Sequence, residues 1–174
     1  MFETKKLVLK HTFLLKASMP LDILIAEDNE FTAKQYKIAL EKRSHKVTMA
    51  KDGVECVDYY LNEAKYDELF RKSRAPPFDL VLLDHDMPRR TGADAAREIL
   101  EYRPNQRLIF LSAYGQGIMQ KLQDLKDDTI QIIQKPFSLN FLVKKIEGST
   151  IKNKIINTQD GNVLTVTQDS AAIR

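Results

Sequence analysis

The sequence predicts one α/β domain in which buried parallel strands alternate with helices on both faces of the sheet. Short apolar runs recur along the chain, and runs of this length are typical of strands buried on both faces. The stretches between them show helical spacing of apolar residues, as in Leu139, Leu142 and Ile146. Such alternation favours a parallel sheet with right-handed crossovers. With 174 residues, 43% of them apolar, the chain can build one core.

Four apolar runs predict buried strands, and a fifth, weaker run predicts an edge strand. The weaker run, 47–50, alternates in polarity, as expected where one face of a strand is less covered. The segment 52–75 is long for one helix and ends at Pro76-Pro77, so we expect a helix followed by an extended loop. The four stronger runs lie at 23–26, 80–83, 108–111 and 130–133.

Charge and polarity divide the chain into three predicted segments. Residues 1–18 form a basic N-terminal extension, whose four lysines against one glutamate account for the whole net charge of +3. Residues 19–148 form the folded domain. Residues 149–174 form a polar tail with one possible strand at 163–166, and this tail is too short for an effector domain. We expect the extension to be a flexible arm or, if Met19 is the true start, to lie upstream of the protein.

Composition indicates neither a nucleic-acid partner nor a membrane partner. Apart from the extension the chain is electrically neutral, and no apolar run approaches the roughly 20 residues that span a bilayer. Lys10 and His11 interrupt the apolar part of the extension, which disfavours a signal peptide. The single cysteine, Cys56, cannot form an internal disulfide. We therefore expect a cytoplasmic location.

Reactive polar side chains follow four of the predicted strands. In a parallel sheet the carboxyl ends of the strands meet at one edge, where ligands bind beside the point at which the strand order reverses. Three carboxylates, one hydroxyl and one ammonium group should therefore surround a single crevice. These residues are Glu27 and Asp28, Asp84, Ser112 and Lys135.

Clustered carboxylates repel one another, and a hard divalent cation with oxygen ligands relieves this repulsion, which points to Mg²⁺. Beside such an ion, Asp84 can act as a nucleophile toward phosphorus and form an aspartyl phosphate. Phosphoryl transfer spreads negative charge over three oxygens, which Mg²⁺, Lys135 and Ser112 could each bind in part. The sequence therefore predicts a phosphoryl-transfer site.

These motifs resemble the motif set of response-regulator receiver domains over about residues 20 to 147. The resemblance implies a flavodoxin-like doubly wound (βα)5 fold with a five-stranded parallel sheet in the order 2-1-3-4-5. It also implies that 19–148 is a receiver domain of a two-component system. The matching motifs are Glu27-Asp28, Leu83-Asp84-His85-Asp86-Met87-Pro88, Ser112-Ala113, Lys135-Pro136-Phe137 and the turn Lys51-Asp52-Gly53-Val54-Glu55.

The resemblance assigns a role to each site residue. Asp84 would accept a phosphoryl group from a histidine kinase or phosphotransfer protein. Asp28, Asp84 and the backbone carbonyl of Asp86 would bind Mg²⁺, with Glu27 acting through water. Lys135 would pair with Asp84 at rest and with the phosphate afterwards, while Ser112 would move inward to bond a phosphate oxygen. The domain would then signal by docking an unknown protein target or by forming a homodimer, without turning over a substrate as an enzyme.

The sequence departs from the family at the aromatic residue usually found three positions before the lysine, where it has Ile132. Output would then depend on the loop 112–117 and the helix after it. Asp86 and Tyr114 occupy the two positions that, in the family, tune the lifetime of the phosphate. His85 has no second histidine or cysteine at ligand spacing, so we expect it to face solvent rather than bind a metal.

Three other interpretations stay open from the sequence. Taken singly, Glu27 and Asp28 could simply begin a helix, and Lys135 could lie in a surface turn. A haloacid-dehalogenase-like phosphatase also uses an Asp-x-Asp motif, a later hydroxyl, a lysine and Mg²⁺. In that family, however, the nucleophile's strand comes first, whereas Asp84 follows the acidic pair. The third alternative is a non-phosphorylated receiver that serves only as an interaction module.

Overall fold

The computed structural model describes residues 19–113, 122, 129–152, 156–157 and 163–164. These belong to two compact units, one made of residues 20–140 and one made of the chain on either side of that range. The unit 20–140 contains every predicted site residue. The predicted domain limits of 19–148 stay a prediction.

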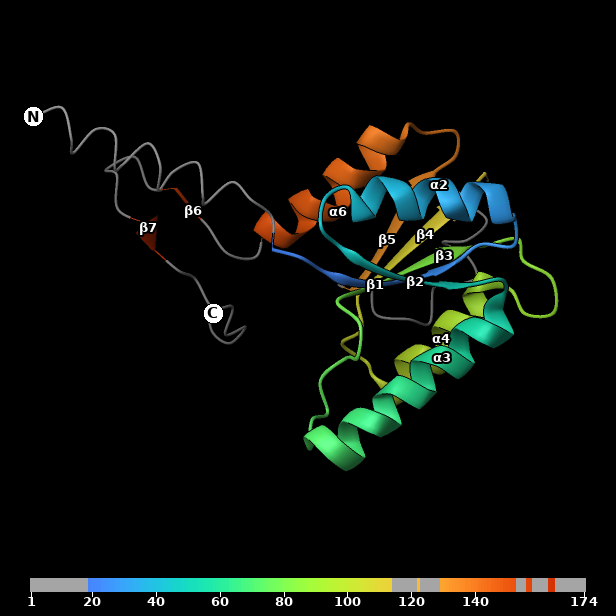
Figure 1. Ribbon diagram of the computed structural model, residues 1–174, viewed down its shortest axis with the longest axis vertical. Coiled ribbons are helices and arrows are strands. Elements are labelled where there is room, and N and C mark those ends of the chain that lie inside the picture. The colour runs from blue at the N-terminus through green and yellow to red at the C-terminus, as the bar shows by residue number, and fades with distance from the viewer. Residues whose placement is uncertain (1–18, 114–121, 123–128, 153–155, 158–162, 165–174) are drawn as a thin grey trace, which may run out of the picture. The chain divides into compact units, whose positions relative to one another are not determined.

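The unit 20–140 is built on a five-stranded parallel sheet in the order β2-β1-β3-β4-β5 (Figure 1). Both the strand order and the edge position of β2 confirm the predictions. The strands are β1 (Asp22–Ala26), β2 (Lys46–Ala50), β3 (Leu80–Asp84), β4 (Leu108–Ser112) and β5 (Ile130–Gln134).

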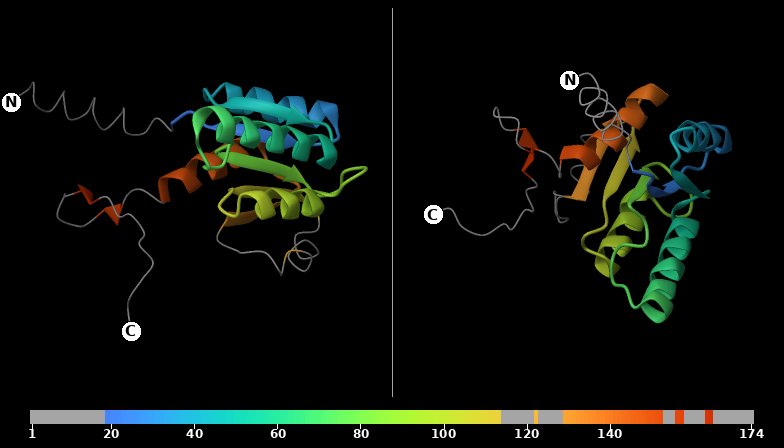
Figure 2. Two further views of the ribbon diagram at one scale, coloured as in Figure 1. Left: turned by 90° about the horizontal axis from the view of Figure 1, so that it is seen from below. Right: turned by 60° about the vertical axis from the view of Figure 1, so that its left-hand side comes forward.

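Helices cover both faces of this sheet. In Figures 1 and 2, α2 (Glu30–Glu41) lies on one face, and α3 (Gly53–Tyr66) and α4 (Gly92–Tyr102) lie on the other. A π-helical turn, η1 (Asp67–Arg71), extends α3, and an irregular loop leads from it to β3, which confirms the helix and loop predicted for 52–75. None of the described helices is long and apolar enough to cross a membrane.

Three helices begin behind a side chain that accepts hydrogen bonds from backbone N–H groups of the first turn, a typical N-cap. Asn29 caps α2, Asp52 caps α3 and Thr91 caps α4. Because α2 begins only after Asn29, Glu27 and Asp28 lie in the segment between β1 and the helix. The two acids are therefore not part of a helix start, and their backbone sits at the carboxyl edge of the sheet.

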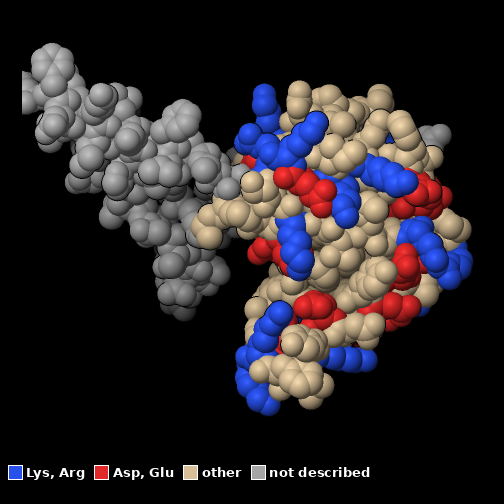
Figure 3. All heavy atoms as spheres, in the orientation of Figure 1, with Lys and Arg blue, Asp and Glu red and all other residues tan. Residues whose placement is uncertain are grey.

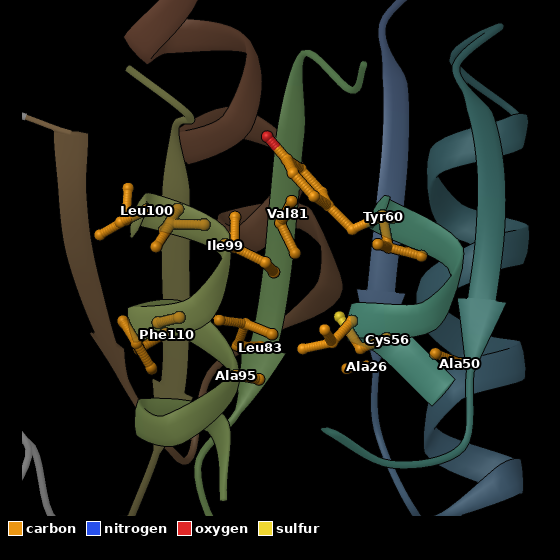
Figure 4. Packing of buried hydrophobic residues seen from close by; sticks show 14 of the residues in the cluster. Ala26, Ala50, Cys56, Tyr60, Val81, Leu83, Ala95, Ile99, Leu100 and Phe110 are labelled. Atoms are coloured by element: carbon orange, nitrogen blue, oxygen red, sulfur yellow. The ribbon is translucent and has the colours of Figure 1, made fainter. Parts of the chain in front are cut away.

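The inner strands are buried on both faces, as their continuous apolar sequences predict. In β1, Ile23 and Ile25 alternate with Leu24 and Ala26, and none of these four side chains is more than 1% exposed. One set, which includes Leu24 and Ala26, packs in the cluster that α3 and α4 cover (Figure 4). A rigid double-sided core of this kind fixes where each strand ends, and so fixes the residues that follow.

Two polar side chains of α3 are enclosed in that cluster. The hydroxyl of Tyr60 donates a hydrogen bond of 2.9 Å to Oε1 of Gln106, and both residues are fully buried. One turn earlier lies the free thiol of Cys56, whose pKa burial raises to about 12. Cys56 therefore stays protonated at neutral pH and packs as a small apolar residue.

In the other unit, α6 (Leu139–Lys152) continues the chain, although its first two residues belong to 20–140. Beyond it, β6 (Ile156–Asn157) pairs antiparallel with β7 (Val163–Leu164). The strand expected at 163–166 is thus found over its first two residues. Its partner β6 was not expected, because a two-residue strand has no periodicity that a sequence can reveal.

Candidate functional site

Three carboxylates and one ammonium group meet at the carboxyl edge of the sheet. Nζ of Lys135 lies 3.2 Å from Oδ2 of Asp84 and 3.3 Å from Oε2 of Glu27. Carboxylate oxygens of Glu27, Asp28 and Asp84 lie within 4.8 Å of one another. The structure therefore brings together four predicted site residues that are far apart in the sequence.

The strands determine this meeting. Asp84 is the last residue of β3, and Glu27 directly follows the neighbouring strand β1, where its backbone N–H still bonds to the carbonyl of Ala50. The start of α4 closes tightly on β3, because a Cβ atom on Gly92 would lie only 2.2 Å from the backbone oxygen of Asp84. Only glycine fits there without moving the backbone that carries the Asp84 side chain.

Burial and like charge act together on Glu27. Its side chain is 3% exposed, and burial followed by the negative charge of Asp84 raises its pKa, although Lys135 and the backbone N–H of Asn29 oppose this. Burial lowers the pKa of the Lys135 ammonium, but Asp84 and Glu27 outweigh it, so the net pKa is raised. Lys135 thus stays charged, and one cation serves two buried acids.

The oxygen-rich cluster fits a hard divalent cation. Glu27 and Asp84 are buried, whereas Asp28 is exposed, so the group opens to solvent on one side. A single lysine leaves the three carboxylates with excess negative charge, which Mg²⁺ with its oxygen ligands would neutralise. The side chain of Asp86 is 67% exposed and lies two residues beyond Asp84. The predicted role of its backbone carbonyl stays a prediction.

Ser112 is the last residue of β4, and its side chain is buried. Its backbone carbonyl accepts a hydrogen bond of 2.7 Å from the N–H of Lys135, which follows β5. The backbones of the predicted hydroxyl and ammonium residues are thus tied together at the same edge as Asp84. The predicted inward movement of Ser112 stays a prediction.

Sequence reasoning missed Tyr36 as a neighbour of the site. Tyr36 is buried on α2. Its ring stacks on that of Phe137, which lies two positions after Lys135 in the sequence, and the ring centroids are 6.0 Å apart. Burial, then the charges of Glu27 and Asp84, raise the pKa of its phenol, so the ring adds an apolar wall beside the acids. Its spacing from Ala33 and Leu40 is that of the buried face of a helix, and this signal alone indicates a core residue.

A second missed feature is the ion pair between Arg89 and Asp52. Arg89 lies in the loop after Asp84, has a positive φ of 63°, and reaches the residue that caps α3. The same loop approaches α3 so closely that a Cβ atom on Gly53 would lie 2.5 Å from the carbonyl oxygen of Arg90. These contacts hold the loop that contains Asp86. The Asp-Gly motif at 52–53 suggested a helix start but not its partner.

The expectation that His85 faces solvent is wrong. Its side chain is only 8% exposed. The backbone N–H of His85 bonds to the carbonyl of Leu111 at 3.3 Å, and its own carbonyl accepts a bond of 3.1 Å from Gly92. Sheet pairing therefore continues one residue beyond β3, and the start of α4 is bonded to the backbone of His85.

Ile132 is half-buried on β5 and packs against the main core cluster. It therefore takes part in packing where the family usually has an aromatic residue. The expectations about Tyr114 and about residues 114–117 with the helix after them lie outside the described residues.

Comparisons with known proteins agree with this geometry. Residues 23–147 match the response regulator receiver domain. Response regulator RR06 of Streptococcus pneumoniae is 34% identical over 129 residues, which cover 74% of this chain and 52% of that protein, so the chain spans about half of its length. Chemotaxis protein CheY of Thermotoga maritima is 32% identical over 125 residues, which cover 71% of this chain and 92% of CheY.

A solved structure gives the same result for the fold. CheY of Borrelia burgdorferi, in a CheX-CheY-BeF3-Mg²⁺ complex, has a TM-score of 0.61 and 26% identity over 75% of this chain and 90% of that chain. The sheet order, the acidic cluster with its lysine and the match over most of the chain agree. The chain therefore belongs to the response regulator receiver domain family, the phosphorylation-activated switches of two-component signalling.

Proposed function

We propose that Asp84 of this receiver domain accepts a phosphoryl group from a histidine kinase or phosphotransfer protein, and that the modified domain signals through protein–protein interaction. The observation that supports this most directly is the position of the Asp84 carboxylate. It is 10% exposed, 3.2 Å from Nζ of Lys135, and grouped with Glu27 and Asp28. An accessible but largely desolvated carboxylate held beside a cation suits nucleophilic attack on phosphorus.

In this reaction an oxygen of Asp84 attacks the phosphorus, a P–O bond forms, and the P–N bond to the donor histidine breaks. The donor nitrogen keeps the electron pair of that bond. Lys135 stays protonated and binds the negative charge that arrives, since its pKa is raised above its ordinary value. The stacked rings of Tyr36 and Phe137 would limit the access of water on one side. The carboxylates are thus positioned for transfer rather than for general acid–base work.

Receiver domains bind Mg²⁺ in an acidic pocket, and we propose Glu27, Asp28 and Asp84 with the carbonyl of Asp86 as its ligands here, Glu27 through water. The ion would offset the repulsion among the acids and withdraw charge from the phosphoryl oxygens. Glu27 and Asp84 are held by the strand ends, whereas the exposed Asp28 can adjust. This division suits an ion that keeps several waters of its own.

Lys135 and Ser112 are proposed to transmit the change. Before transfer, Lys135 is divided between Asp84 and Glu27. A phosphorylated Asp84 presents more negative charge, which would draw Lys135 away from Glu27 and give the hydroxyl of Ser112 a phosphate oxygen to bond. Because the backbones of these two residues are hydrogen-bonded, a shift of one moves β4 and β5 together.

The phosphatase alternative is not favoured. The acidic pair precedes the strand of Asp84 in sequence and directly follows β1, the strand that pairs with β3 in space, as in receivers. Receiver domains are typically non-catalytic signalling modules, and we propose that this chain has no turnover beyond its own phosphorylation and dephosphorylation. A cytoplasmic location and homodimerisation on phosphorylation remain parts of the proposal.

The test is incubation of the full chain with acetyl phosphate and Mg²⁺, followed by mass spectrometry. We expect one added phosphoryl group that hydroxylamine removes, as an acyl phosphate requires, and that chelation of Mg²⁺ prevents. Asp84→Asn should abolish it, and Asp58→Asn, an exposed acid on α3, should not. Labelling that persists in Asp84→Asn would identify another acceptor. No labelling of the unaltered chain would favour the non-phosphorylated interaction module.

A further inference from the structure

The far end of α3 carries an exposed apolar surface that the site does not use. Tyr66, Leu69 and Phe70, here called the α3-end patch, are 47%, 64% and 69% exposed. The rings of Tyr66 and Phe70 lie 4.7 Å apart, and the guanidinium of Arg71 lies 5.2 Å from the centre of the Tyr66 ring. Large apolar side chains grouped in this way at the surface mark interaction sites more often than scattered ones do.

The acids near the patch point inward, to partners within the domain. Asp67 is buried and accepts a hydrogen bond of 2.5 Å from Arg71. Glu68 forms an ion pair with Arg103 and accepts a bond of 3.1 Å from the hydroxyl of Tyr102. The carboxylates of Asp67 and Glu68 are therefore already paired within the domain and are not directed toward a binding partner.

Most of the exposed charges around the patch are positive. Lys65, Lys72 and Arg74 are exposed on either side of it. One further acid, Glu63, is 43% exposed, but its carboxylate lies 3.6 Å from the guanidinium of Arg71, which offsets its charge. Figure 3 shows uncharged side chains at the lower end of the view, where α3 ends, with blue Lys and Arg side chains on both sides and red acidic side chains above them. An apolar centre with a cationic rim complements a segment that is apolar on one face and acidic around it.

The patch is remote from Asp84. The capping residue of α3, Asp52, contacts the loop that follows Asp84 through Arg89. Tyr66 is 14 positions further along the helix, a rise of about 21 Å. A partner on the patch would therefore leave the phosphoryl site open.

We propose that the α3-end patch docks an acidic, amphipathic segment of a protein partner, and that this docking does not depend on phosphorylation of Asp84. The charges argue against two other occupants from this chain. The segment 1–18 is basic, and a second copy of the patch would bring like charges together. An acidic, amphipathic segment complements both the apolar centre and the cationic rim of the patch.

The first test selects ligands from a random dodecapeptide display library on the full chain. Binders of the double variant Leu69→Ser, Phe70→Ser are removed first; both side chains are exposed, so the variant should keep its fold. We expect enriched peptides that combine Asp or Glu with Leu, Phe or Trp and that bind equally well before and after treatment with acetyl phosphate. Enrichment of basic peptides, or equal binding to the double variant, would overturn the proposal.

A fluorescence reporter then separates the occupants. The chain has no tryptophan, so Phe70→Trp introduces a single indole, and Phe31→Trp, at a 72% exposed position on α2, is the matched control. An enriched peptide that contains no tryptophan should shift the emission of Phe70→Trp to shorter wavelength, and the double change Lys72→Glu, Arg74→Glu should weaken the binding of that peptide at least tenfold. Phe31→Trp should not respond.

Three results contradict an acidic protein segment. Emission of Phe70→Trp that is already blue-shifted in dilute free protein would mean that the chain covers its own patch. A blue shift that grows with protein concentration would mean self-association. A shift with phosphatidylglycerol vesicles but not with the enriched peptide would mean a lipid surface. Each outcome leaves phosphoryl labelling of Asp84 unaffected, so the two proposals fail separately.

Discussion

Glu27 and Asp52 are both buried carboxylates at the carboxyl edge of the same sheet, yet their surroundings act in opposite directions. Glu27 shares Lys135 with Asp84, and its pKa is raised. Asp52 is also desolvated, but Arg89 and the backbone N–H groups of the first turn of α3 outweigh this and lower its pKa. Burial alone therefore does not decide whether the pKa of an acid rises or falls. What differs between these two acids is that Glu27 shares its cation with a second carboxylate, whereas Asp52 does not share its donors.

This contrast separates a structural acid from a functional one. Asp52 has a full set of partners, so a further cation would gain nothing there. The cluster around Glu27 has more negative charge than its one lysine offsets, so it is stabilised by any ligand that supplies positive charge. The two regions can therefore be told apart by experiment.

Among the variants considered, Lys135→Ala should change stability most, because it leaves Glu27 and Asp84 without a cation. We expect a loss of about 2–3 kcal/mol in the free energy of unfolding without Mg²⁺, near the range for removing one partner of a buried pair. Added Mg²⁺ should restore part of the lost stability. Denaturant unfolding with and without the ion measures this recovery. Some phosphorylation of Asp84 should persist, uncoupled from structural change. The same loss with and without Mg²⁺ would contradict the shared-cation description.

Asp28→Ala should weaken Mg²⁺ binding at least tenfold, equivalent to about 1.4 kcal/mol, because the ion loses a charged ligand. Asp28 is exposed, so stability without the ion should hardly change. Calorimetric titration with Mg²⁺ measures the affinity, and Asp58→Ala is the matched exposed control. Wild-type affinity in Asp28→Ala would remove this residue from the metal site.

Glu27→Gln tests how the buried acid of the site makes stability depend on pH. A raised pKa means that the folded protein holds a proton more tightly than the unfolded chain does. The contribution of Glu27 to stability is therefore greatest below the ordinary glutamate pKa of 4.5 and is lost as pH rises through the raised pKa. The variant should lack this decline and be more stable at pH 7 by roughly 0.5–1 kcal/mol. Unfolding curves across this pH range, without Mg²⁺, test it; parallel curves would refute it.

Asp52→Asn should have the smallest effect, because asparagine caps a helix as well as aspartate does and Arg89 is largely exposed. We expect a loss of about 0.2–1 kcal/mol at pH 7. The stability contributed by Asp52 changes with pH in the opposite direction to that of Glu27. It is present above pH 3.8 and is lost as pH falls through the lowered pKa. A loss that persists in the Arg89→Gln background would show that the ion pair is not its cause.

The sequence predicts the strands and the site for the same reason. Apolar runs such as 80–83 and 108–111 locate strands, and the next polar residue, Asp84 or Ser112, then lies at the edge of the sheet. Contacts between separate loops have no such periodicity. The Arg89–Asp52 pair depends on a positive φ and on how closely two turns approach, which residue types alone do not specify.

Burial of single residues is equally hard to predict when tertiary packing decides it. His85 looks like a loop residue, and only the folded structure shows that its side chain is buried. Tyr36 looks like ordinary core on one face of α2, and only the fold places the acids beside it. The sequence therefore identifies the groups that take part in chemistry, whereas the surfaces that enclose them follow from the packing.

The buried thiol of Cys56 has a practical consequence for studying this switch. It is the sole cysteine of the chain and is fully enclosed and protonated at neutral pH. Maleimide reagents, which attack exposed thiolates, should therefore leave it unmodified in the native state. A cysteine introduced on the surface would then take a spin label or dye selectively, so distances within the domain could be followed without first removing a native residue.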